Sequence, residues 1–209
     1  AQIVGWGKNE TAWTLDYVEL PGDPSRDEVW ALLSELLNTP LYTSGGKALH
    51  IEATAIDTGG HHAQDVYAYV RSQPARRVIA IKGSSIPSKP VLNKPSSLDF
   101  DWRGKTYKRG VSLYSVGTDT GKHRFFGRLN SDAGLPAEER RIRFSQDLEA
   151  SFYDGLLSET FDPEKNRFVK MRGKRNEPLD TWNYAYAAGH HPELLIHIKP
   201  AKEWDAIDD

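Results

Sequence analysis

The chain has no cysteine, little net charge and no long apolar run, and each shortage excludes a class of protein. Without cysteine it can form neither disulfides nor thiolate metal sites, which suits a reducing compartment. A formal net charge of −2 gives no overall attraction to nucleic acid, so phosphate contacts must come from local clusters of Lys and Arg. No apolar run approaches the ~20 residues that span a bilayer, so we expect no membrane-spanning helix.

The composition otherwise indicates a folded protein. With 209 residues, 38% of them hydrophobic, and six Trp and nine Tyr, the chain is long enough to bury a core. We predict one domain over residues 1–188 and a polar tail over 189–209. The opening residues AQIVGWG resemble the interior of a strand, so we expect the chain to be part of a longer polypeptide.

The first part of the chain predicts a mixed α/β sheet. Apolar residues separated by a polar turn predict an antiparallel hairpin over 2–7 and 12–20. Asp23-Pro24 predicts the start of a helix that ends near Asn38. A strand ending at Asp57, a helix from Ala63 and a strand over 77–82 then predict a parallel βαβ unit.

The second part begins with a segment rich in Pro, Ser, Lys and Arg over 83–110, which predicts a long basic loop. Such a loop suits contact with a phosphate backbone, and a solvated surface loop is the alternative. The remaining elements that we expect are strands over 111–116 and 123–129, a helix over 146–157, a strand over 167–171 and a helix from Asn176 to about Ala188.

Residues 117–122, GTDTGK, superficially resemble a phosphate-binding loop. The spacing does not fit, because three residues separate Gly117 from Gly121 where that motif has four. His123 also stands where Ser or Thr is required, and we expect a strand rather than a helix to follow. A nucleotide site is therefore rejected, and Lys122 is left as a candidate phosphate contact or an exposed turn lysine.

Two acids stand apart from the other carboxylates by their context. Asp57 ends a strand just before Gly59 and Gly60, which would let a metal or phosphate approach closely, and Asp180 lies in the first turn of a helix. Oxygen ligands without cysteine favour Mg²⁺ or Mn²⁺, and two such ions held by carboxylates are how nucleases cleave phosphodiesters. The alternative for Asp57 is a simple helix-capping turn.

The histidines do not favour zinc, because both pairs are adjacent in sequence and lack the i, i+4 spacing of helical ligands. His62, at the expected helix start, is a phosphate contact or a capping or surface residue. Arg172, Lys174 and Arg175 form a second basic cluster that suits DNA.

Five ordered blocks then carry a resemblance that covers nearly the whole chain to about Ala188. They are VGWG with WTLDY, IDTGG, IKGSS with SKPV, VGTDTGK, and RNEPLD with YAYAA. Together they resemble the carboxyl-terminal nuclease domain of the phage terminase large subunit, lambda-like (GpA) family. The resemblance implies an RNase H-like fold, with a mixed sheet flanked by helices and a long basic loop or hairpin insertion.

The resemblance also implies an activity, a site and partners. It implies a two-metal-ion endonuclease that cuts concatemeric viral DNA, with two Mg²⁺ or Mn²⁺ ions, Asp57 and Asp180 as metal-binding acids, and Lys82 as a basic residue beside the site. The implied partners are double-stranded viral DNA, the terminase small subunit, the portal of the procapsid and an ATPase domain of the same polypeptide. The implied location is the host cytoplasm, with transient docking on the procapsid.

One departure from the family pattern concerns the metal site. The family's first metal-binding aspartate lies on a strand that would precede residue 1, so we expect weak or no cleavage by this stretch alone. A restriction-type nuclease core is disfavoured, because Ala80 stands where that motif needs an acid before Lys82. A non-catalytic DNA-binding or docking module of the packaging motor is the other alternative.

Overall fold

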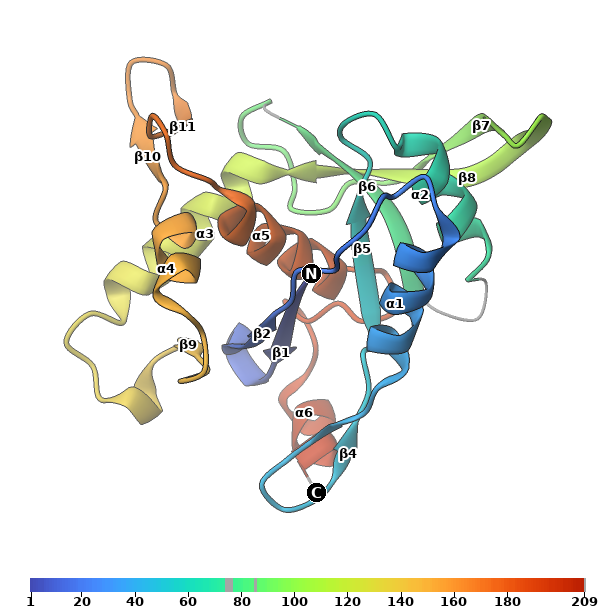
Figure 1. Ribbon diagram of the computed structural model, residues 1–209. Helices are drawn as coiled ribbons and strands as arrows, with labels where there is room; N and C mark the ends of the chain where they lie inside the picture. The colour runs from blue at the N-terminus through green and yellow to red at the C-terminus, as the bar shows by residue number, and fades with distance from the viewer. Residues whose placement is uncertain (74–76, 85, 209) are drawn as a thin grey trace. The chain divides into compact units, whose positions relative to one another are not determined.

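The computed structural model describes residues 1–73, 77–84 and 86–208 and divides into two compact units (Figure 1). The first unit comprises Ala1–Val18, Gly83–Asn93 and Ser115–Asp209, and the second comprises Glu19–Lys82 and Lys94–Tyr114. Both units contain strands and helices, which confirms the predicted mixed α/β class. Ser85, in the predicted basic loop, and Asp209, in the predicted tail, lie outside the described residues.

A three-stranded sheet in the order β1–β2–β9 forms one layer of the first unit. β1 (Gln2–Trp6) and β2 (Ala12–Tyr17) pair antiparallel across the short 3-10 turn η1 (Lys8–Glu10), as predicted. β9 (Ile142–Phe144) pairs parallel with β2. The central position of β2 explains why Ala12 and Thr14 are completely buried.

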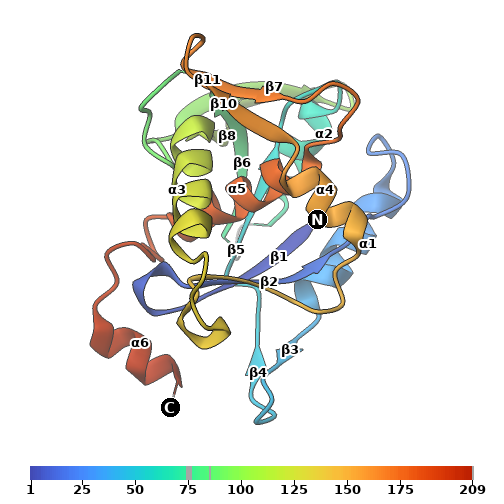
Figure 2. The same ribbon diagram turned by 90° about the vertical axis from the view of Figure 1, so that its left-hand side faces the viewer.

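Helix α5 (Glu177–Gly189) forms the core of the first unit and contacts β1, α3 (Thr118–Ser131) and α4 (Ala150–Leu156). Figure 2 shows α3 and α5 side by side. Trp182 and Tyr186 are fully buried, and the Trp6 ring of β1 packs 5.7 Å and 5.3 Å from theirs, centroid to centroid. The helix begins after Asn176 with Pro178 in its first turn, as predicted.

A charged cluster joins α3 to the second half of α5. Arg128 of α3 forms an ion pair with Glu10 of η1, and the Tyr186 hydroxyl donates to Glu10 Oε1 at 2.6 Å. Arg124, one turn earlier on α3, donates to the Tyr186 hydroxyl at 3.1 Å. Burial opposes the charge of Glu10, but the Tyr186 hydrogen bond and Arg128 outweigh it and lower the pKa of this carboxyl.

The rest of the first unit consists of short elements. β10 (Glu159–Asp162) and β11 (Arg167–Lys170) form an antiparallel hairpin, and η2 (Ala137–Glu139) precedes β9. α6 (Ala201–Asp208) lies in the segment predicted as a tail, where Trp204 is buried and Asp205 forms an ion pair with Lys8.

The second unit contains most of a four-stranded sheet in the order β5–β6–β8–β7. β5 (Ala53–Asp57) and β6 (Arg77–Ser84) are parallel, and α2 (Ala63–Arg71) lies between them in the sequence, which confirms the predicted βαβ unit. β7 (Ser96–Trp102) and β8 (Lys105–Gly117) form an antiparallel hairpin. α1 (Asp27–Asn38) and the small hairpin of β3 (Leu41–Tyr42) and β4 (Ala48–Leu49) precede β5.

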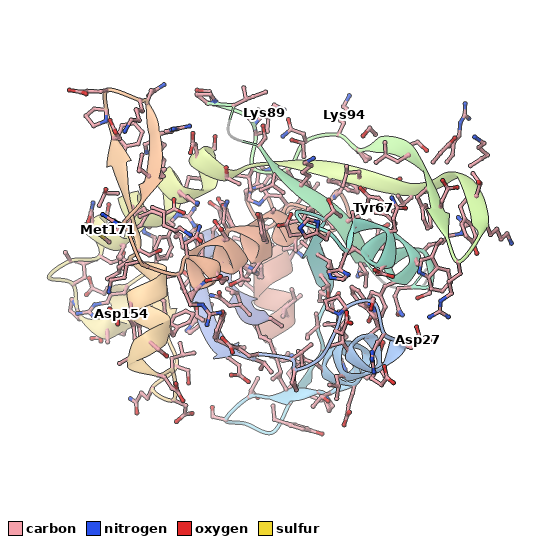
Figure 3. The ribbon with its side chains drawn as sticks, turned by 45° about the horizontal axis from the view of Figure 1, so that its top comes forward. Asp27, Tyr67, Lys89, Lys94, Asp154 and Met171 are labelled. Atoms are coloured by element: carbon pink, nitrogen blue, oxygen red, sulfur yellow. The ribbon has the colours of Figure 1, made fainter. Side chains whose placement is uncertain are left out.

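The core of the second unit lies between α2 and the sheet. Tyr67 of α2, labelled in Figure 3, packs edge-on against Phe100 of β7 with ring centroids 5.7 Å apart. Val66, Ala80 and Val111 complete the buried cluster. The apolar face of α2 thus holds in place the strand and turn that carry Asp57.

Two predictions in the middle of the chain are wrong. Residues 123–129 belong to helix α3 rather than to a strand, and so do residues 118–122 of the predicted turn. Much of the predicted loop over 83–110 forms the β7–β8 hairpin, because Leu98, Phe100 and Trp102 alternate with exposed Asp99 and Asp101.

Smaller differences concern helix ends and the connection before β7. α1 begins at Asp27, because Asp23 instead accepts a hydrogen bond from the Ser25 amide at 2.9 Å in a preceding turn. The helix predicted over 146–157 is shortened to α4. Lys89, labelled in Figure 3 between β6 and β7, accepts a hydrogen bond at its carbonyl from Thr120 Oγ1 at 2.6 Å.

Within the part of the chain that the structure describes, every helix is too short or too polar to cross a membrane.

Candidate functional site

Asp57 is the last residue of β5, and its side chain is exposed. It stands opposite Ile81 in the parallel ladder with β6. The next residue, Thr58, is buried, and both its amide and its Oγ1 donate to the Ile81 carbonyl at 2.9 Å. These two hydrogen bonds to β6 fix the chain directly after Asp57, so the carboxylate projects from a rigid strand end.

The geometry requires glycine at each of the two positions after Thr58, for a different reason at each. The Gly59 amide donates to Asp57 Oδ1 at 3.2 Å, and a Cβ at this position would lie only 2.9 Å from Asp57 Oδ2. Gly60 has a φ of +102°, a conformation that side chains disfavour. The turn therefore closes onto the carboxylate from one side.

Two of the predicted DNA-contact residues lie in the same unit as Asp57. Lys82 is exposed on β6 and directly follows Ile81, the ladder partner of Asp57. His62 occupies the N-cap position of α2, and its Nδ1 lies 3.4 Å from Asp65 Oδ2. His62 is thus a half-exposed residue at a helix start, in contact with an acid of the same helix.

Asp180 lies in the first turn of α5, in the other unit. Its Oδ1 is 2.9 Å from Lys122 Nζ, and its Oδ2 accepts a hydrogen bond from Asn176 Nδ2 at 2.8 Å. The N-terminal dipole of α5 adds stabilisation of about 0.3–1 kcal/mol to a carboxylate at this place. The carboxylate is therefore held at both of its oxygens.

Lys122 is not the exposed turn lysine that the sequence predicts. It lies on α3 with 7% of its surface exposed, and its Nζ lies 2.9 Å from both carboxylate oxygens of Glu159. Burial opposes its charge, but the attraction of Asp180 and the hydrogen bonds of Glu159 outweigh burial and raise the pKa of Lys122. The ammonium group of Lys122 is therefore bound by two acids of the chain and is not exposed to a DNA phosphate.

Glu159 and Asn176 also take part in this cluster, although the sequence marks Asn176 only as the start of a helix and does not mark Glu159 at all. Glu159, the first residue of β10, is 7% exposed, and its Oε1 accepts a hydrogen bond from Asn176 Nδ2 at 2.8 Å. The cluster of Lys122, Glu159, Asn176 and Asp180 is called the Lys122 cluster below. Its members come from α3, β10, the N-cap of α5 and α5 itself, so spacing in the sequence could not reveal it.

The basic cluster after β11 is exposed, as the sequence suggests. Arg172, Lys174 and Arg175 lie on the connection from β11 to α5, which starts near Met171 in Figure 3. Lys174 Nζ lies 3.3 Å from Asp154 of α4, and Arg175 Nε lies 3.3 Å from Glu177. Exposed pairs of this kind contribute little to stability, so these cations remain accessible to an anionic partner.

Asp57 belongs to the second unit and Asp180 to the first. Among residues 1–73, 77–84 and 86–208, no group of three or more His, Asp or Glu side chains is arranged to hold a metal ion. The chemistry that the geometry defines is thus one exposed acid on a rigid strand end and one acid held by a buried lysine.

Comparison with known proteins decides what kind of domain this is. Residues 1–204 match the family described as "Terminase large subunit gpA, endonuclease domain". The chain belongs to this family. It is 30% identical over 197 residues to "Terminase, large subunit" of Enterobacteria phage P21 and 28% identical over 199 residues to "Terminase, large subunit" of Escherichia phage lambda.

The family match confirms the resemblance predicted from the five sequence blocks. The alignments cover 89% and 90% of this chain but only 29% of either relative, so the chain spans less than a third of the terminase large subunits that it matches. No solved structure gives a significant match.

Proposed function

We propose that this terminase endonuclease domain cuts double-stranded viral DNA by divalent-metal-dependent hydrolysis of phosphodiester bonds, with Asp57 and Asp180 as metal ligands. The observation that carries the proposal is membership of an endonuclease-domain family over residues 1–204. The positions of the two acids support it, because each lies at the end of a regular element that restricts its movement.

The donor set fits Mg²⁺ or Mn²⁺. Both proposed ligands are carboxylates, which are hard oxygen donors, and the chain lacks the cysteine that softer metals prefer. Asp57 is exposed, and in the part of the chain that the structure describes its Oδ1 accepts a hydrogen bond from the Gly59 amide. Asp180 adds a second carboxylate to this donor set, and its two oxygens also bond Lys122 and Asn176.

The chain's own residues bind and orient the substrate in this proposal. Exposed Lys82 directly follows Ile81, the ladder partner of Asp57, on the neighbouring strand, and in this proposal its ammonium group contacts a DNA phosphate. His62, Arg172, Lys174 and Arg175 supply further phosphate contacts. When bound, two divalent ions activate water and stabilise the leaving oxygen in this class of reaction.

The biological setting is proposed on the same basis. The matched relatives are terminase large subunits, of which this chain spans 29%. We propose an RNase H-like nuclease fold, concatemeric viral DNA as substrate, and an ATPase domain in the same polypeptide. We further propose that the terminase small subunit and the procapsid portal are partners, and that the protein acts in the host cytoplasm while docked transiently on the procapsid.

Removal of either acid tests the proposal. Asp57→Asn and Asp180→Asn should each reduce Mn²⁺-dependent cleavage of linear duplex DNA by at least ~100-fold, because each removes a ligand charge. DNA affinity should stay equal or rise, since a negative charge is lost. Asp205→Asn, which removes an exposed acid from an ion pair with Lys8, is the matched control and should cut normally.

The assay is performed on the chain itself. Normal cutting by both Asn variants would refute the catalytic assignment. DNA binding without cleavage would instead favour a docking module of the packaging motor.

A further inference from the structure

Lys122 places a buried positive charge between two acids of different elements. Its Nζ lies 2.9 Å from Asp180 Oδ1 and 2.9 Å from both oxygens of Glu159. The Lys122 and Glu159 side chains are 8% and 5% exposed, whereas that of Asp180 is 30% exposed. Asp180, which also bonds Lys122, is therefore the acid of this group that lies nearest the surface.

Stability alone does not explain such a pair. Removing two charges from water is costly, and well-packed apolar residues of similar volume are often at least as stabilising as a buried ion pair. The pair does, however, impose a geometry, because the ammonium group must satisfy both acids at once.

The side-chain amide of Asn176 bonds the same two acids as Lys122. Asn176 Nδ2 donates at 2.8 Å to Glu159 Oε1 and at 2.8 Å to Asp180 Oδ2. Lys122 and Asn176 thus bond different oxygens of Asp180 and share Glu159 as their common anchor. Two donors on opposite oxygens restrict the rotation of a carboxylate plane.

The backbone around Lys122 is equally constrained. Its neighbour Gly121 faces Asn183 of α5 so closely that a Cβ would lie 1.6 Å from Asn183 Oδ1. α3 therefore approaches α5 at the turn that carries Lys122. This close approach sets the reach from Lys122 to Asp180.

We propose that Lys122, anchored by Glu159, is a positioning residue that fixes the orientation of the Asp180 carboxylate for DNA cleavage. The inference rests on the proposed function, because it assigns Lys122 a role through the acid proposed as a metal ligand. Residues that orient metal ligands affect metal affinity or activity by typically 10–100-fold. A structural ion pair with no such role would leave both unchanged once folding is restored.

A charge-neutral double variant separates the two roles. Lys122→Met alone strands Glu159 as an unpaired buried charge and should lower the urea midpoint sharply. Lys122→Met/Glu159→Met keeps the net charge and should restore the midpoint. With positioning lost, the double variant should bind Mn²⁺ about 10–100-fold more weakly, measured by electron paramagnetic resonance of free Mn²⁺.

Kinetics of the same double variant provide the second readout. The kcat for DNA cleavage should fall at least ~10-fold while the KM for DNA stays nearly constant, since the exposed cations are untouched. Glu159→Gln keeps one acceptor oxygen but turns the other partner of Lys122 into an amide donor, so its loss of Mn²⁺ affinity should be smaller than that of the double variant. Lys8→Met/Asp205→Met, which removes an exposed pair in the same unit, should match the unchanged chain throughout.

Specific outcomes would overturn the inference. A folded double variant with normal Mn²⁺ affinity and kcat would make the pair purely structural. A loss in Glu159→Gln as large as in the double variant would assign the effect to the Glu159 charge instead of Lys122. If Asp180→Asn cuts normally, the proposed function itself fails; if Asp180→Asn is inactive while the double variant is normal, only this inference fails.

Discussion

Replacing Gly121 by alanine tests the contact between α3 and α5 on which the Lys122 cluster depends. The added Cβ would lie 1.6 Å from Asn183 Oδ1 and 2.8 Å from its Cγ. Asn183 is completely buried, and its Nδ2 donates to the Thr118 carbonyl at 3.3 Å. The amide must therefore turn away or the two helices must separate.

The magnitude follows from three contributions. Overpacking of a core typically costs about 1–3 kcal/mol. Loss of the Asn183 hydrogen bond adds about 0.5–1.5 kcal/mol. Alanine is favoured over glycine inside a helix by about 1 kcal/mol, which offsets part of both.

The same substitution at Gly127 removes the helix-propensity contribution from the comparison. Gly127 lies on the same helix, and a Cβ there meets no atom of the described residues within 4 Å. Gly127→Ala should therefore stabilise α3 by up to about 1 kcal/mol. Relative to this control, Gly121→Ala should be less stable by about 1.5–4.5 kcal/mol.

Urea unfolding followed by tryptophan fluorescence provides the measurement, because Trp182 packs 4.5 Å from Phe125 of α3, centroid to centroid. Gly121→Ala should unfold at lower urea than the unchanged chain, and Gly127→Ala at equal or higher urea. Equal stability of the two alanine variants would show that α3 does not approach α5 as closely as described, and would remove the support for the position of Lys122.

Two further predictions concern the turn after β5 and the end of α5. Gly59→Ala should weaken Mn²⁺ affinity and cleavage about 10–100-fold, because its Cβ would displace the Asp57 carboxylate. Stability should change little, since that carboxylate is exposed. Gly45→Ala, in an exposed loop of the same unit, is the control and should change neither Mn²⁺ affinity nor cleavage. Burial, opposed by the Tyr186 carbonyl and reinforced by His197, lowers the pKa of His190 from 6.5 to about 4. The folded chain then binds a proton at His190 less readily than the unfolded chain. Neutral His190 therefore contributes at most about 3 kcal/mol to the free energy of unfolding. This contribution is complete above pH 6.5 and is lost as pH falls toward 4. His190→Gln should flatten urea midpoints between pH 4.5 and 7, and an unchanged slope would contradict the assignment.

Elements whose signals are local could be predicted from the sequence. The first hairpin follows from its apolar alternation, and α5 follows from Asn176, Pro178 and the apolar face behind them. Asp57 and Asp180 could be placed at a strand end and in a first helical turn for the same reason. Their local environments are properties of short stretches of chain.

Helix α3 could not be recognised in this way because its start resembles a turn. Gly117, Thr118 and Gly121 are residues that favour turns, and a glycine inside a helix costs about 1 kcal/mol relative to alanine. The contact with Asn183, far later in the chain, makes glycine the residue that fits at position 121. Lys122, Phe125 and Leu129 carry the helical spacing that could have corrected the prediction.

The Lys122 cluster cannot be predicted from the sequence for a different reason. Glu159 is one of 29 acidic residues, and nothing beside it in the sequence distinguishes it. Its importance comes from burial and from contact with α3 and the start of α5, which are both distant in the chain. Contacts of this kind depend on tertiary packing, which periodicity does not encode.

The charged contacts between α3 and α5 occur at two separate levels. Lys122 bonds Asp180 near the beginning of α5, and Arg128 and Arg124 reach Tyr186, directly or through Glu10, near its end. A slide or roll of one helix along the other would have to break both sets together. The two helices therefore move as one rigid pair. The orientation of the Asp180 carboxylate then depends on contacts along the whole length of α5 instead of on a single helical turn.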